Sequence, residues 1–323
     1  MKWEKGKNWN IGLDWTLFKG RLYGSFNYFS RRQQDLLGDY NVSVPPYLFT
    51  STFVNVGSMH NSGFEFDVTW NAIKSKDFSY TLNVVGATMN NKFVDFSNSK
   101  FVGQDYYDEV SPEDPYPFHH LQRIERGRRI GSFYMLKYAG VDKQGRWVVY
   151  DKNNNMVLAD NATDEDRQYV GNGLPRFTGS MTHTFHYKQF DASLFFQTAL
   201  GFDIFNIHDF YYSTKNFQGN VMDKAYSKNK LVSQNPIVSD YFLEPGDYLK
   251  LSSVNIGYTL NLNKRFIDSV RIYATASNLF TITKFSGIDP STWELNGLTP
   301  GATNSRTYYP NTRQFMLGMQ IDF

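Results

Sequence analysis

The sequence has no cysteine and no long apolar run, and each absence excludes a class of protein. Without cysteine there is no disulfide framework and no thiolate metal site. No segment approaches the roughly 18 consecutive apolar residues of a membrane-spanning helix. Helical periodicity is also scarce, because Gly, Asn, Ser and Thr interrupt most windows that could form an apolar helix face. The start of the chain lacks the apolar core of a secretory signal.

A surplus of either charge is missing as well. The 33 Lys and Arg residues nearly balance the 31 Asp and Glu residues, which argues against a nucleic-acid binder driven by a basic surface. Aromatic residues are abundant instead, at 17% of the chain, although the mean hydropathy is only −0.48. Composition alone suits a soluble cytoplasmic protein, and the periodicity of the sequence contradicts that interpretation.

Apolar and polar residues alternate with a period of two in many segments, which is the pattern of half-buried β-strands. In NWNIGLDWTL the odd residues from Trp9 to Leu17 form an apolar face, and in GFEFDVTWN and DFSYTLNVV the even residues do so. The alternation slips at Ser252 and Ser253 in YLKLSSVNIGYTL, where we expect a β-bulge. We count about ten strands of roughly nine to eleven residues, long enough to cross a bilayer. The sequence therefore predicts an all-β fold.

Short and long connections alternate between these strands. Short connections follow Leu17, Asn71, His186 and Leu260. Long connections cover approximately 32–61, 90–174, 201–246 and 282–312. Soluble sandwiches have short turns at both ends, so the asymmetry predicts an antiparallel transmembrane β-barrel with long extracellular loops and short periplasmic turns. Inside the second long connection, SFYMLKYAGV and RWVVYD predict a small hairpin above the membrane.

One face of each barrel strand meets lipid and the other a polar lumen, because a sheet crosses a bilayer only when its backbone groups are all paired. The expected lumen-facing residues are Asp14, Glu65, Asp67, Asn83, Gln314 and Gln320. Aromatic residues near strand ends suit interfacial girdles: Trp9, Trp15, Tyr28, Trp70, Tyr80, Tyr187 and Tyr248. The alternative is a soluble β-sandwich or propeller, whose strands would be about five or six residues long.

Five stretches resemble the SusC/RagA-type TonB-dependent transporters of Bacteroidetes outer membranes. They are NVGSMHNSGFEFDVTWN, GNGLPRFTGS with the later GFDIFN, LEPGDYLKLSSVNIGYTL, RIYATASNLFTITKFSGIDPST and YYPNTRQFMLGMQIDF. Their order and spacing hold over most of residues 8–323. The resemblance implies that residues 1–323 are the C-terminal portion of one barrel, roughly the last ten of about 22 strands. The plug domain, N-terminal extension and signal peptide of that family are absent from the sequence.

The same resemblance implies a location and partners. Members of this family work in the outer membrane of Gram-negative bacteria. The implied partners are outer-membrane lipid, a SusD-like surface lipoprotein, the missing N-terminal barrel and plug half, TonB acting through that absent plug, and the barrel-assembly machinery. No cofactor, metal or nucleic acid is expected.

In the final stretch, RQFMLGMQIDF, large apolar residues occupy every second position up to the last residue. Phe315, Leu317, Met319, Ile321 and Phe323 share one parity, and a terminal aromatic residue on the lipid face resembles the C-terminal signal that the barrel-assembly machinery recognises. We therefore expect Phe323 to be a true C-terminus on the periplasmic side, with the missing part of the barrel at the other end of the chain.

The long loops combine aromatic rings with amide and carboxylate side chains, which suits the capture of glycan, or nearly as well peptide, at a barrel mouth. The candidates for substrate contact are Tyr106, Tyr107, Phe205, Asn206, Tyr211, Tyr212, Trp293 and Asn296. The alternative for each ring is that it packs the loops against one another.

A calcium site has little support. Asp151, Asn153 and Asn155 match the first ligand positions of a calcium loop. Met156 and Ala162 stand where such a loop needs Gly and Glu, so a polar turn is favoured.

Histidine pairs and catalytic motifs are equally uninformative. The adjacent His119 and His120 point in opposite directions on an extended chain, and His183 and His186 have opposite parity on their strand. No residue pattern indicates a hydrolase or a nucleotide-binding loop, so we expect no enzyme.

Three functions remain open. The first is part of a SusC-type, TonB-dependent nutrient importer, which transports its substrate without covalent change. The second is a passive porin-like or adhesion barrel, which predicts ion conductance by this chain alone. The third is a soluble β glycan-binding module, which predicts heat-resistant solubility without detergent.

Overall fold

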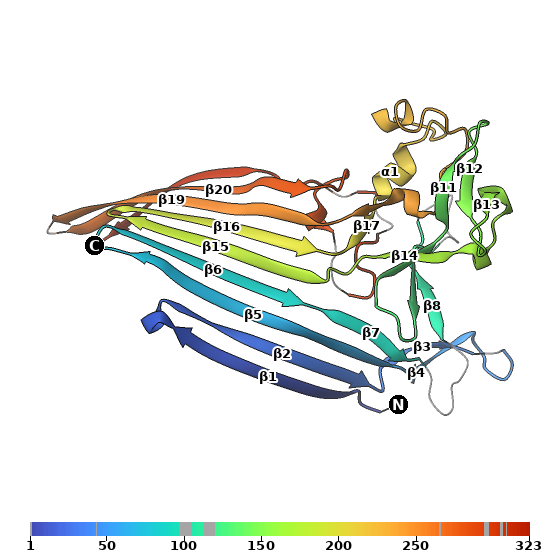
Figure 1. Ribbon diagram of the computed structural model, residues 1–323, viewed down its shortest axis with the longest axis horizontal. Helices are drawn as coiled ribbons and strands as arrows, with labels where there is room; N and C mark the ends of the chain where they lie inside the picture. Colours follow the sequence, from blue (N-terminus) through green and yellow to red (C-terminus); the bar gives the residue numbers. More distant parts are fainter. Residues whose placement is uncertain are drawn as a thin grey trace.

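The computed structural model shows one long, curved antiparallel sheet with a cluster of loops at one end (Figure 1). It describes residues 2–42, 44–96, 105–112, 120–264, 266–293, 297–303, 306–307 and 309–323. No helix among these residues is long and apolar enough to cross a membrane. The all-β prediction is confirmed: the described elements are nearly all strands, with one short α-helix and a few single 3₁₀ turns.

Nine long strands form the path of the large sheet, in the order β1-β2-β5-β6-β15-β16-β19-β20-β21. Their bounds are β1 (Lys5–Leu17), β2 (Leu22–Gln34), β5 (Ser58–Lys74), β6 (Phe78–Thr88), β15 (Phe177–Tyr187), β16 (Phe190–Leu200), β19 (Tyr248–Lys264), β20 (Ile267–Thr283) and β21 (Gln314–Asp322). A tenth strand, β7 (Asn90–Asp95), pairs with the outer part of β5. The sheet is not closed, because β1 and β21 are its two edges.

The strands are longer than the sequence analysis expected. Several have 13 or 17 residues, because the alternation continues beyond the bilayer-length core into the ends next to the loops. Residues such as Ile, Val, Thr and the aromatics fit a pleated, half-covered surface and support these long strands.

Short and long connections lie at opposite ends of the sheet, as predicted. The four short turns gather at one end of the sheet and the long connections at the other (Figure 1). The expected hairpin is also present, formed by β11 (Lys137–Val141) and β12 (Trp147–Tyr150). SFYM does not belong to it, because β10 (Ser132–Met135) pairs with β9 (Gln122–Glu125) and β14 (Gln168–Asn172) instead.

The remaining elements are short and lie in the long connections. The strands are β3 (Leu37–Asn41), β4 (Ser51–Asn55), β8 (Tyr106–Glu109), β13 (Met156–Leu158), β17 (Asp203–Phe205) and β18 (Leu243–Pro245). The helices are α1 (Ile207–Tyr212) and the 3₁₀ turns Phe18–Gly20, Ala159–Asn161, Asp164–Asp166, Asp223–Ala225, Asp240–Phe242 and Pro290–Thr292. Asn206 caps α1, its side-chain oxygen accepting a hydrogen bond from the amide of Asp209 at 3.2 Å.

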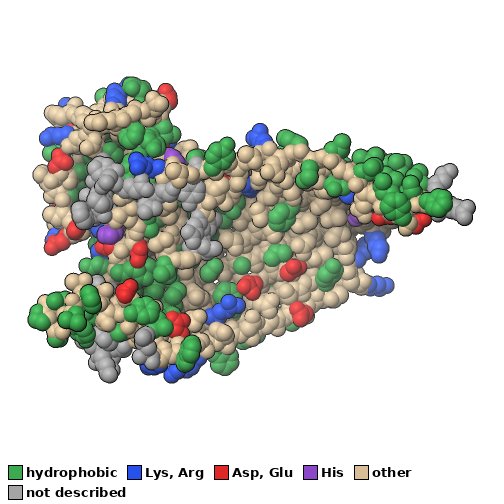
Figure 2. All heavy atoms as spheres, turned by 180° about the vertical axis from the view of Figure 1, so that it is seen from behind, with side chains coloured by type: hydrophobic (Ala, Val, Ile, Leu, Met, Phe, Trp, Pro, Cys, Tyr) green, Lys and Arg blue, Asp and Glu red, His purple; other side chains and the backbone are tan. Residues whose placement is uncertain are grey.

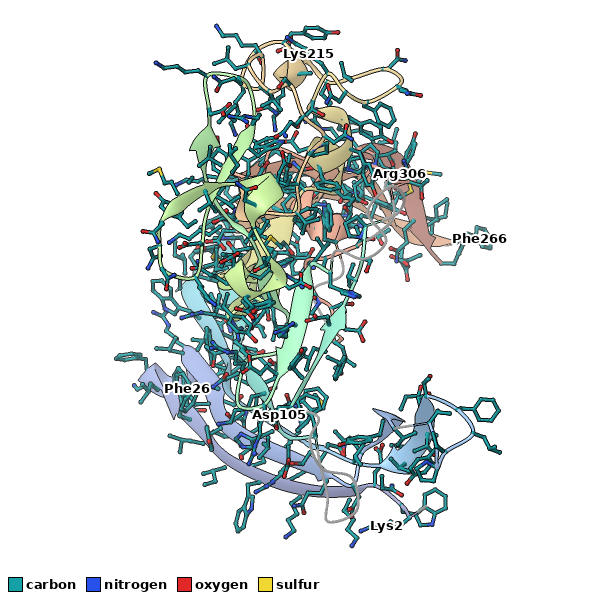
Figure 3. All side chains as sticks on the ribbon, turned by 90° about the vertical axis from the view of Figure 1, so that its right-hand side faces the viewer. Lys2, Phe26, Asp105, Lys215, Phe266 and Arg306 are labelled. Carbon is teal, nitrogen blue, oxygen red and sulfur yellow. The ribbon has the colours of Figure 1, made fainter. Side chains whose placement is uncertain are left out.

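The pairing register gives the large sheet one apolar and one polar face. Residues opposite each other in an antiparallel pair share a face. Thus Leu13 pairs with Phe26 and Phe26 with Phe66, while Asp14 pairs with Ser25 and Ser25 with Asp67. Phe26 points outward from the convex side of the arc (Figure 3), so the apolar face is convex and the polar face concave.

A bulge in β19 keeps these faces continuous. The pairing of β19 with both neighbours shifts between Leu251 and Ser253, at the place where the sequence alternation slips. One consequence is that Tyr248 pairs with Ala199 on the concave face. The prediction that Tyr248 belongs to the convex aromatic girdle is therefore wrong, because the bulge inverts the parity of the outer part of this strand.

Candidate transport wall and loop cluster

The concave face carries a polar wall built from cross-strand neighbours. Asp14, Ser25 and Asp67 lie in one row across β1, β2 and β5. On β6, the amide of Asn83 donates hydrogen bonds to Asp67 Oδ1 at 3.0 Å and to Thr69 Oγ1 at 2.9 Å. A shallow hollow of about 390 Å³ lies beside Asp14 and Asp67. In Figure 2 acidic side chains stand out over the middle of this face.

The six residues expected to face a lumen share this concave face. Glu65 lies two residues from Asp67 on the same strand. Successive pairs connect Asn83 to the other edge of the sheet through Thr182, Phe195, Ser253 and Ser277 to Gln314. Gln320 pairs with Arg271 on the same side. Their common face agrees with the predicted wall, and its contact with a water-filled lumen stays a prediction.

A second polar group lies on the concave face near the short turns. The guanidinium of Arg271 donates to both carboxylate oxygens of Asp191, at 2.9 and 2.6 Å, and to Asn255 Oδ1 at 3.0 Å. A fork of this geometry is among the stronger charged contacts in proteins. It connects β16, β19 and β20 across the wall.

The loop cluster has its own hydrophobic core, formed by the second, third and fourth long connections. Trp147, Phe133 and Phe242 are fully buried in it. The ring of Phe205 packs against those of Phe210 and Phe242, at centroid distances of 5.4 and 6.2 Å. A core of this size holds the long connections in one arrangement instead of leaving them as separate loops.

Half of the predicted substrate-contact residues belong to this core or its lining. Phe205, Asn206, Tyr211 and Trp293 are 0–4% exposed, so their side chains offer no contact surface in this conformation. The three aromatic rings pack the long connections against one another, which was the alternative to substrate contact. Asn206 has a structural role as well, because it caps α1.

The other four candidates lie in different places. Tyr106 is 48% exposed. Tyr107 is half-buried against Phe93 and Phe96, and burial together with the charge of Glu109 raises the pKa of its hydroxyl. Tyr212 is half-buried, and its ring meets that of Phe217 edge to face. Asn296 lies outside the described residues.

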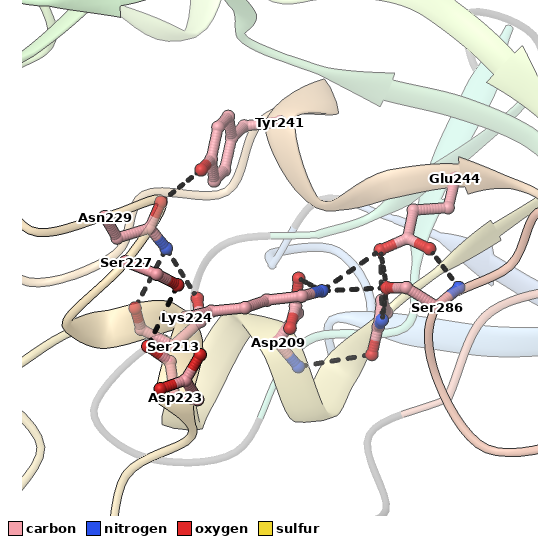
Figure 4. A network of polar contacts seen from close by, with 10 residues as sticks. Asp209, Ser213, Asp223, Lys224, Ser227, Asn229, Tyr241, Glu244 and Ser286 are labelled. Carbon is pink, nitrogen blue, oxygen red and sulfur yellow. Dashed lines mark hydrogen bonds and ion pairs between the residues drawn. The ribbon is translucent and has the colours of Figure 1, made fainter.

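A polar network that includes Asp209 of α1 joins the third and fourth long connections (Figure 4). The ammonium of Lys224 donates to Asp209 Oδ2 at 2.6 Å and to Ser286 Oγ at 2.8 Å. Glu244 accepts from the amide of Ser286 at 2.6 Å and from the side chain of Asn206 at 3.1 Å. Burial raises the pKa of Asp209, and the hydrogen bond and charge of Lys224 partly offset this rise.

A buried ion pair ties the fourth long connection to the concave wall. The ammonium of Lys250, whose side chain is 4% exposed, lies 2.8 Å from Asp289 Oδ2 and donates to Ser291 Oγ at 2.8 Å. Burial opposes ionisation of Asp289, but hydrogen bonds from Lys250 and Ser291 outweigh it, and the pKa of Asp289 is lowered. The loop is thereby held against the outer end of β19.

A stack of arginine and tyrosine side chains, which the sequence pattern did not predict, lies on the small sheet β14-β10-β9-β8. The guanidinium of Arg123 lies between the rings of Tyr106 and Tyr134, 3.8 and 4.0 Å from their centroids. It also donates to both oxygens of Asp108, at 2.6 and 2.8 Å. The available signal is an acidic residue in YYDE and an arginine in QRIE, which lie opposite each other as Asp108 and Arg123 once the two strands pair.

The described part of the loop cluster also contains a pocket of about 270 Å³. Its lining includes Asp160, Asp164, Arg167 and His120, so it carries both charge signs. Arg167 is held by hydrogen bonds to the backbone oxygens of His120 and Tyr134, both at 2.7 Å. A lining that combines both charge signs with apolar side chains such as Leu136 and Ile237 can hold a small group that forms hydrogen bonds.

The residues weighed for a calcium or histidine site have the following places in the structure. Asp151 Oδ1 accepts hydrogen bonds from the amides of Asn153 and Asn155, both at 2.8 Å, which is the polar turn that the sequence favoured. His183 pairs with Leu82 and His186 with Ser79, so the two imidazoles occupy opposite faces. Among the described residues no group of acidic and histidine side chains could hold a metal. His119 lies outside those residues.

The family model described as TonB dependent receptor-like, β-barrel matches residues 1–279. Among curated relatives, TonB-dependent receptor P3 of Formosa agariphila is 29% identical over all of this chain and 34% of its own length. TonB-dependent receptor SusC of Bacteroides thetaiotaomicron is 28% identical, with 100% of this chain and 32% of the relative covered. The chain thus spans about a third of the length of the curated relatives it matches.

Solved structures also match the whole of this chain and about a third of their own chains. The structure of the RagAB peptide transporter aligns with a TM-score of 0.81 and 25% identity, covering 100% of this chain and 36% of that one. The "open-open" state of the RagAB peptide importer aligns with a TM-score of 0.76 and 23% identity, and it supports the fold alone.

Proposed function

The chain belongs to the TonB-dependent receptor-like β-barrel family, and we propose that it forms part of the barrel wall and the outward loops of a SusC-type nutrient importer. Its place would be the outer membrane, in which barrels of this family lie. Its strands would be the C-terminal portion of one barrel, roughly ten of about 22, completed by an N-terminal barrel and plug half.

The observation that carries the proposal is the two-faced sheet with all its short turns at one end. The convex face exposes large apolar side chains such as Leu13, Phe64 and Leu317, at 62%, 62% and 80%. A soluble protein rarely exposes so continuous an apolar surface, whereas a barrel wall requires one toward lipid. The concave face would then be the wetted wall against which a plug rests.

Transport in this proposal involves no covalent change. Substrate is held at the outer mouth by the long loops and a SusD-like lipoprotein. Energy from the inner membrane, relayed by TonB to the plug, then opens the path along the polar wall. The barrel-assembly machinery would insert the chain, with the alternating residues Phe315 to Phe323 as its recognition signal.

The loop cluster supports capture of a glycan or a peptide. RagAB, to which the chain is 25% identical, is described as a peptide transporter, so peptides are the first cargo to test. The pocket beside Arg167 and Asp164 offers both charge signs, which complements the two termini of a peptide. Exposed Tyr106 stacked on Arg123 offers a ring face to a sugar.

Folding in detergent tests the barrel proposal. The chain is expressed alone and with an N-terminal barrel and plug half, and heat-modifiable gel migration and planar-bilayer conductance are measured. We expect folding only when both halves are present, without open-channel conductance. Conductance by the chain alone would instead establish a passive porin, and heat-resistant solubility without detergent would establish a soluble module.

Uptake by whole cells tests the transport step. Cells that contain the assembled barrel should accumulate labelled oligopeptide or oligosaccharide, and removal of TonB or of the proton gradient should abolish accumulation. Uptake that continues at the same rate without TonB contradicts an energised importer.

A further inference from the structure

Five basic side chains form one row across the outer end of the convex face. Cross-strand pairs connect them in sequence: Lys7 with Arg32, Arg32 with His60, His60 with Lys92, and Lys92 with Arg129. They come from β1, β2, β5, β7 and the loop after β9. We call this set the basic row.

The basic row shares the convex face with the apolar side chains. Lys7 has the parity of Trp9 and Leu13, and Arg32 has that of Tyr28 and Phe26. The apolar residues Ile11, Tyr28 and Phe64 lie in one cross-strand row, and the basic row is two rows further toward the loops. Each such step along a strand is about 7 Å, so the charges lie just outside the apolar band.

No described acidic side chain forms an ion pair with a member of the basic row. Lys2 and Lys5, by contrast, both contact Asp35, at 3.0 and 3.8 Å. Lys7 lies opposite Arg32, and Lys92 lies opposite Arg129. Like charges directly opposite each other destabilise a strand pair. The basic side chains therefore repel one another, and an anion lying across the row would offset this repulsion.

At one end of the row, Arg129 meets a second arginine that has no ion pair with a described residue. Burial and the neighbouring charge of Arg176 lower the pKa of Arg129. One guanidinium nitrogen of Arg129 donates to the backbone oxygens of Met89 and Pro175, at 3.3 and 3.0 Å, while the other, Nη1, is buried without a hydrogen-bond partner among the described residues.

A pocket of about 600 Å³ lies beside these two arginines. Its walls also include Tyr28 of the aromatic girdle and Phe64, whose ring packs against that of Tyr28. The two guanidinium groups and the apolar surface thus belong to one continuous site.

We propose that the basic row, with Arg176, binds the phosphate groups of anionic lipid headgroups in the outward-facing leaflet, while the acyl chains lie on the convex apolar face. The inference rests on the proposed membrane orientation. Arginine binds phosphate bidentately, and basic residues beside an apolar band attract anionic lipid through the local surface potential. A lipid fits better than an acidic protein because the charges form a single row parallel to the edge of the apolar band.

Retention of a phosphorylated lipid tests the site. The assembled protein is purified from outer membranes in mild detergent, incubated with mixed micelles of phosphatidylcholine with or without monophosphoryl lipid A, and its bound lipid is counted by native mass spectrometry. The test variant is Lys7→Gln/Arg32→Gln/Lys92→Gln. We expect its affinity for monophosphoryl lipid A to fall roughly a hundredfold, because three cationic contacts are removed, and the remaining binding to weaken with salt.

A matched variant removes the same charge at the other end of the sheet. Lys19→Gln/Lys74→Gln/Lys76→Gln changes exposed residues beside the short turns, and it should bind the lipid like the parent protein. Lys7→Arg/Lys92→Arg keeps the charge and should also bind. Heat-modifiable migration of every variant confirms that its barrel is intact.

The outcomes separate this inference from the barrel proposal. If the Gln variant of the basic row retains as much monophosphoryl lipid A as the parent protein, the lipid site is overturned. The barrel proposal is not affected by that result. Competition by free inorganic phosphate as strong as that by the lipid assigns the row to a soluble anion and overturns the lipid assignment. If the Gln variant of the basic row loses a co-purifying acidic protein but keeps its lipid, the lipid assignment is also overturned. Absence of the protein from the outer membrane contradicts both proposals.

Discussion

At the scale of single residues, the pair Lys250–Asp289 couples the wall to the loops. Its two charges are removed from water, and each is held by the other and by Ser291. Removing either charge is strongly destabilising, because the remaining buried charge has lost its hydration and has no opposite charge to compensate for that loss.

Replacing Asp289 should release the fourth long connection from the wall. Asp289→Ala leaves the ammonium of Lys250 without its carboxylate, and we expect a loss of about 3 kcal/mol in local stability. Hydrogen exchange of the amides in 284–293 measures it. The double variant Lys250→Met/Asp289→Leu should recover most of the protection, and a double variant as unprotected as the single one would contradict the explanation.

The same contact should respond to acid. The folded pKa of Asp289 lies below its ordinary value of 3.8, so its ionised form contributes stability that is fully present above the ordinary pKa. That contribution is lost as the pH falls through the lowered value. Pepsin cleavage within 284–293 should therefore increase between about pH 4 and about pH 2. Asp289→Asn should lack this titration, and an identical pH profile in both proteins would exclude Asp289 as its source.

At the scale of elements, the sequence predicts the large sheet better than the loops. Long strands with a strict period of two reveal their faces and their short turns. The small strands β8 to β14 have three to five residues, too few for periodicity to distinguish them from irregular loop. The aromatic loop residues illustrate a second limit, because no local pattern shows whether a ring such as Phe205 faces a ligand or a neighbouring loop.

A close approach between two long connections gives a prediction at this scale. A Cβ at Gly173 would lie 1.8 Å from the backbone oxygen of Pro300 and 3.0 Å from the Cα of Gly301. Gly173→Ala should therefore destabilise the loop cluster by about 1–3 kcal/mol and leave the large sheet intact. Limited proteolysis of the loops, with heat-modifiable migration as the measure of the sheet, checks both effects.

The control for that prediction is Gly38→Ala. A Cβ at Gly38 would have no described heavy atom within 4 Å, and the residue has no positive φ, so alanine should fit there without strain. A Gly38→Ala protein as sensitive to protease as Gly173→Ala would show that general fragility, and not the contact with Pro300, is responsible.

At the scale of the whole molecule, the curved sheet brings together residues that the sequence separates widely. The polar wall extends from Asp14 to Gln320, and its members could be predicted because each belongs to a strongly alternating strand. The basic row could not be predicted, because Lys7, His60 and Arg129 meet only through the register of several strand pairs.

Two adjacent residues test the assignment of the faces. Phe26→Arg places a cation on the convex face, where lipid contact should cost about 2–4 kcal/mol and reduce insertion into the outer membrane. Ser25→Arg places the same cation between Asp14 and Asp67 on the concave face and should be tolerated. Outer-membrane yield and heat-modifiable migration compare them, and equal loss in both variants would contradict a lipid-facing convex side.

The bulge at Ser252 has a consequence for comparing this chain with its relatives. If the strand kept all its residues but paired without a bulge, Lys250 would lie on the convex side and Leu251 on the concave side, and Asp289 would lose its partner. An alignment that runs without a gap from Tyr248 to Leu260 against a strand lacking the bulge would therefore match wall residues with membrane residues. Pairwise identity in this strand is meaningful only when its two parts are aligned separately on either side of Ser252.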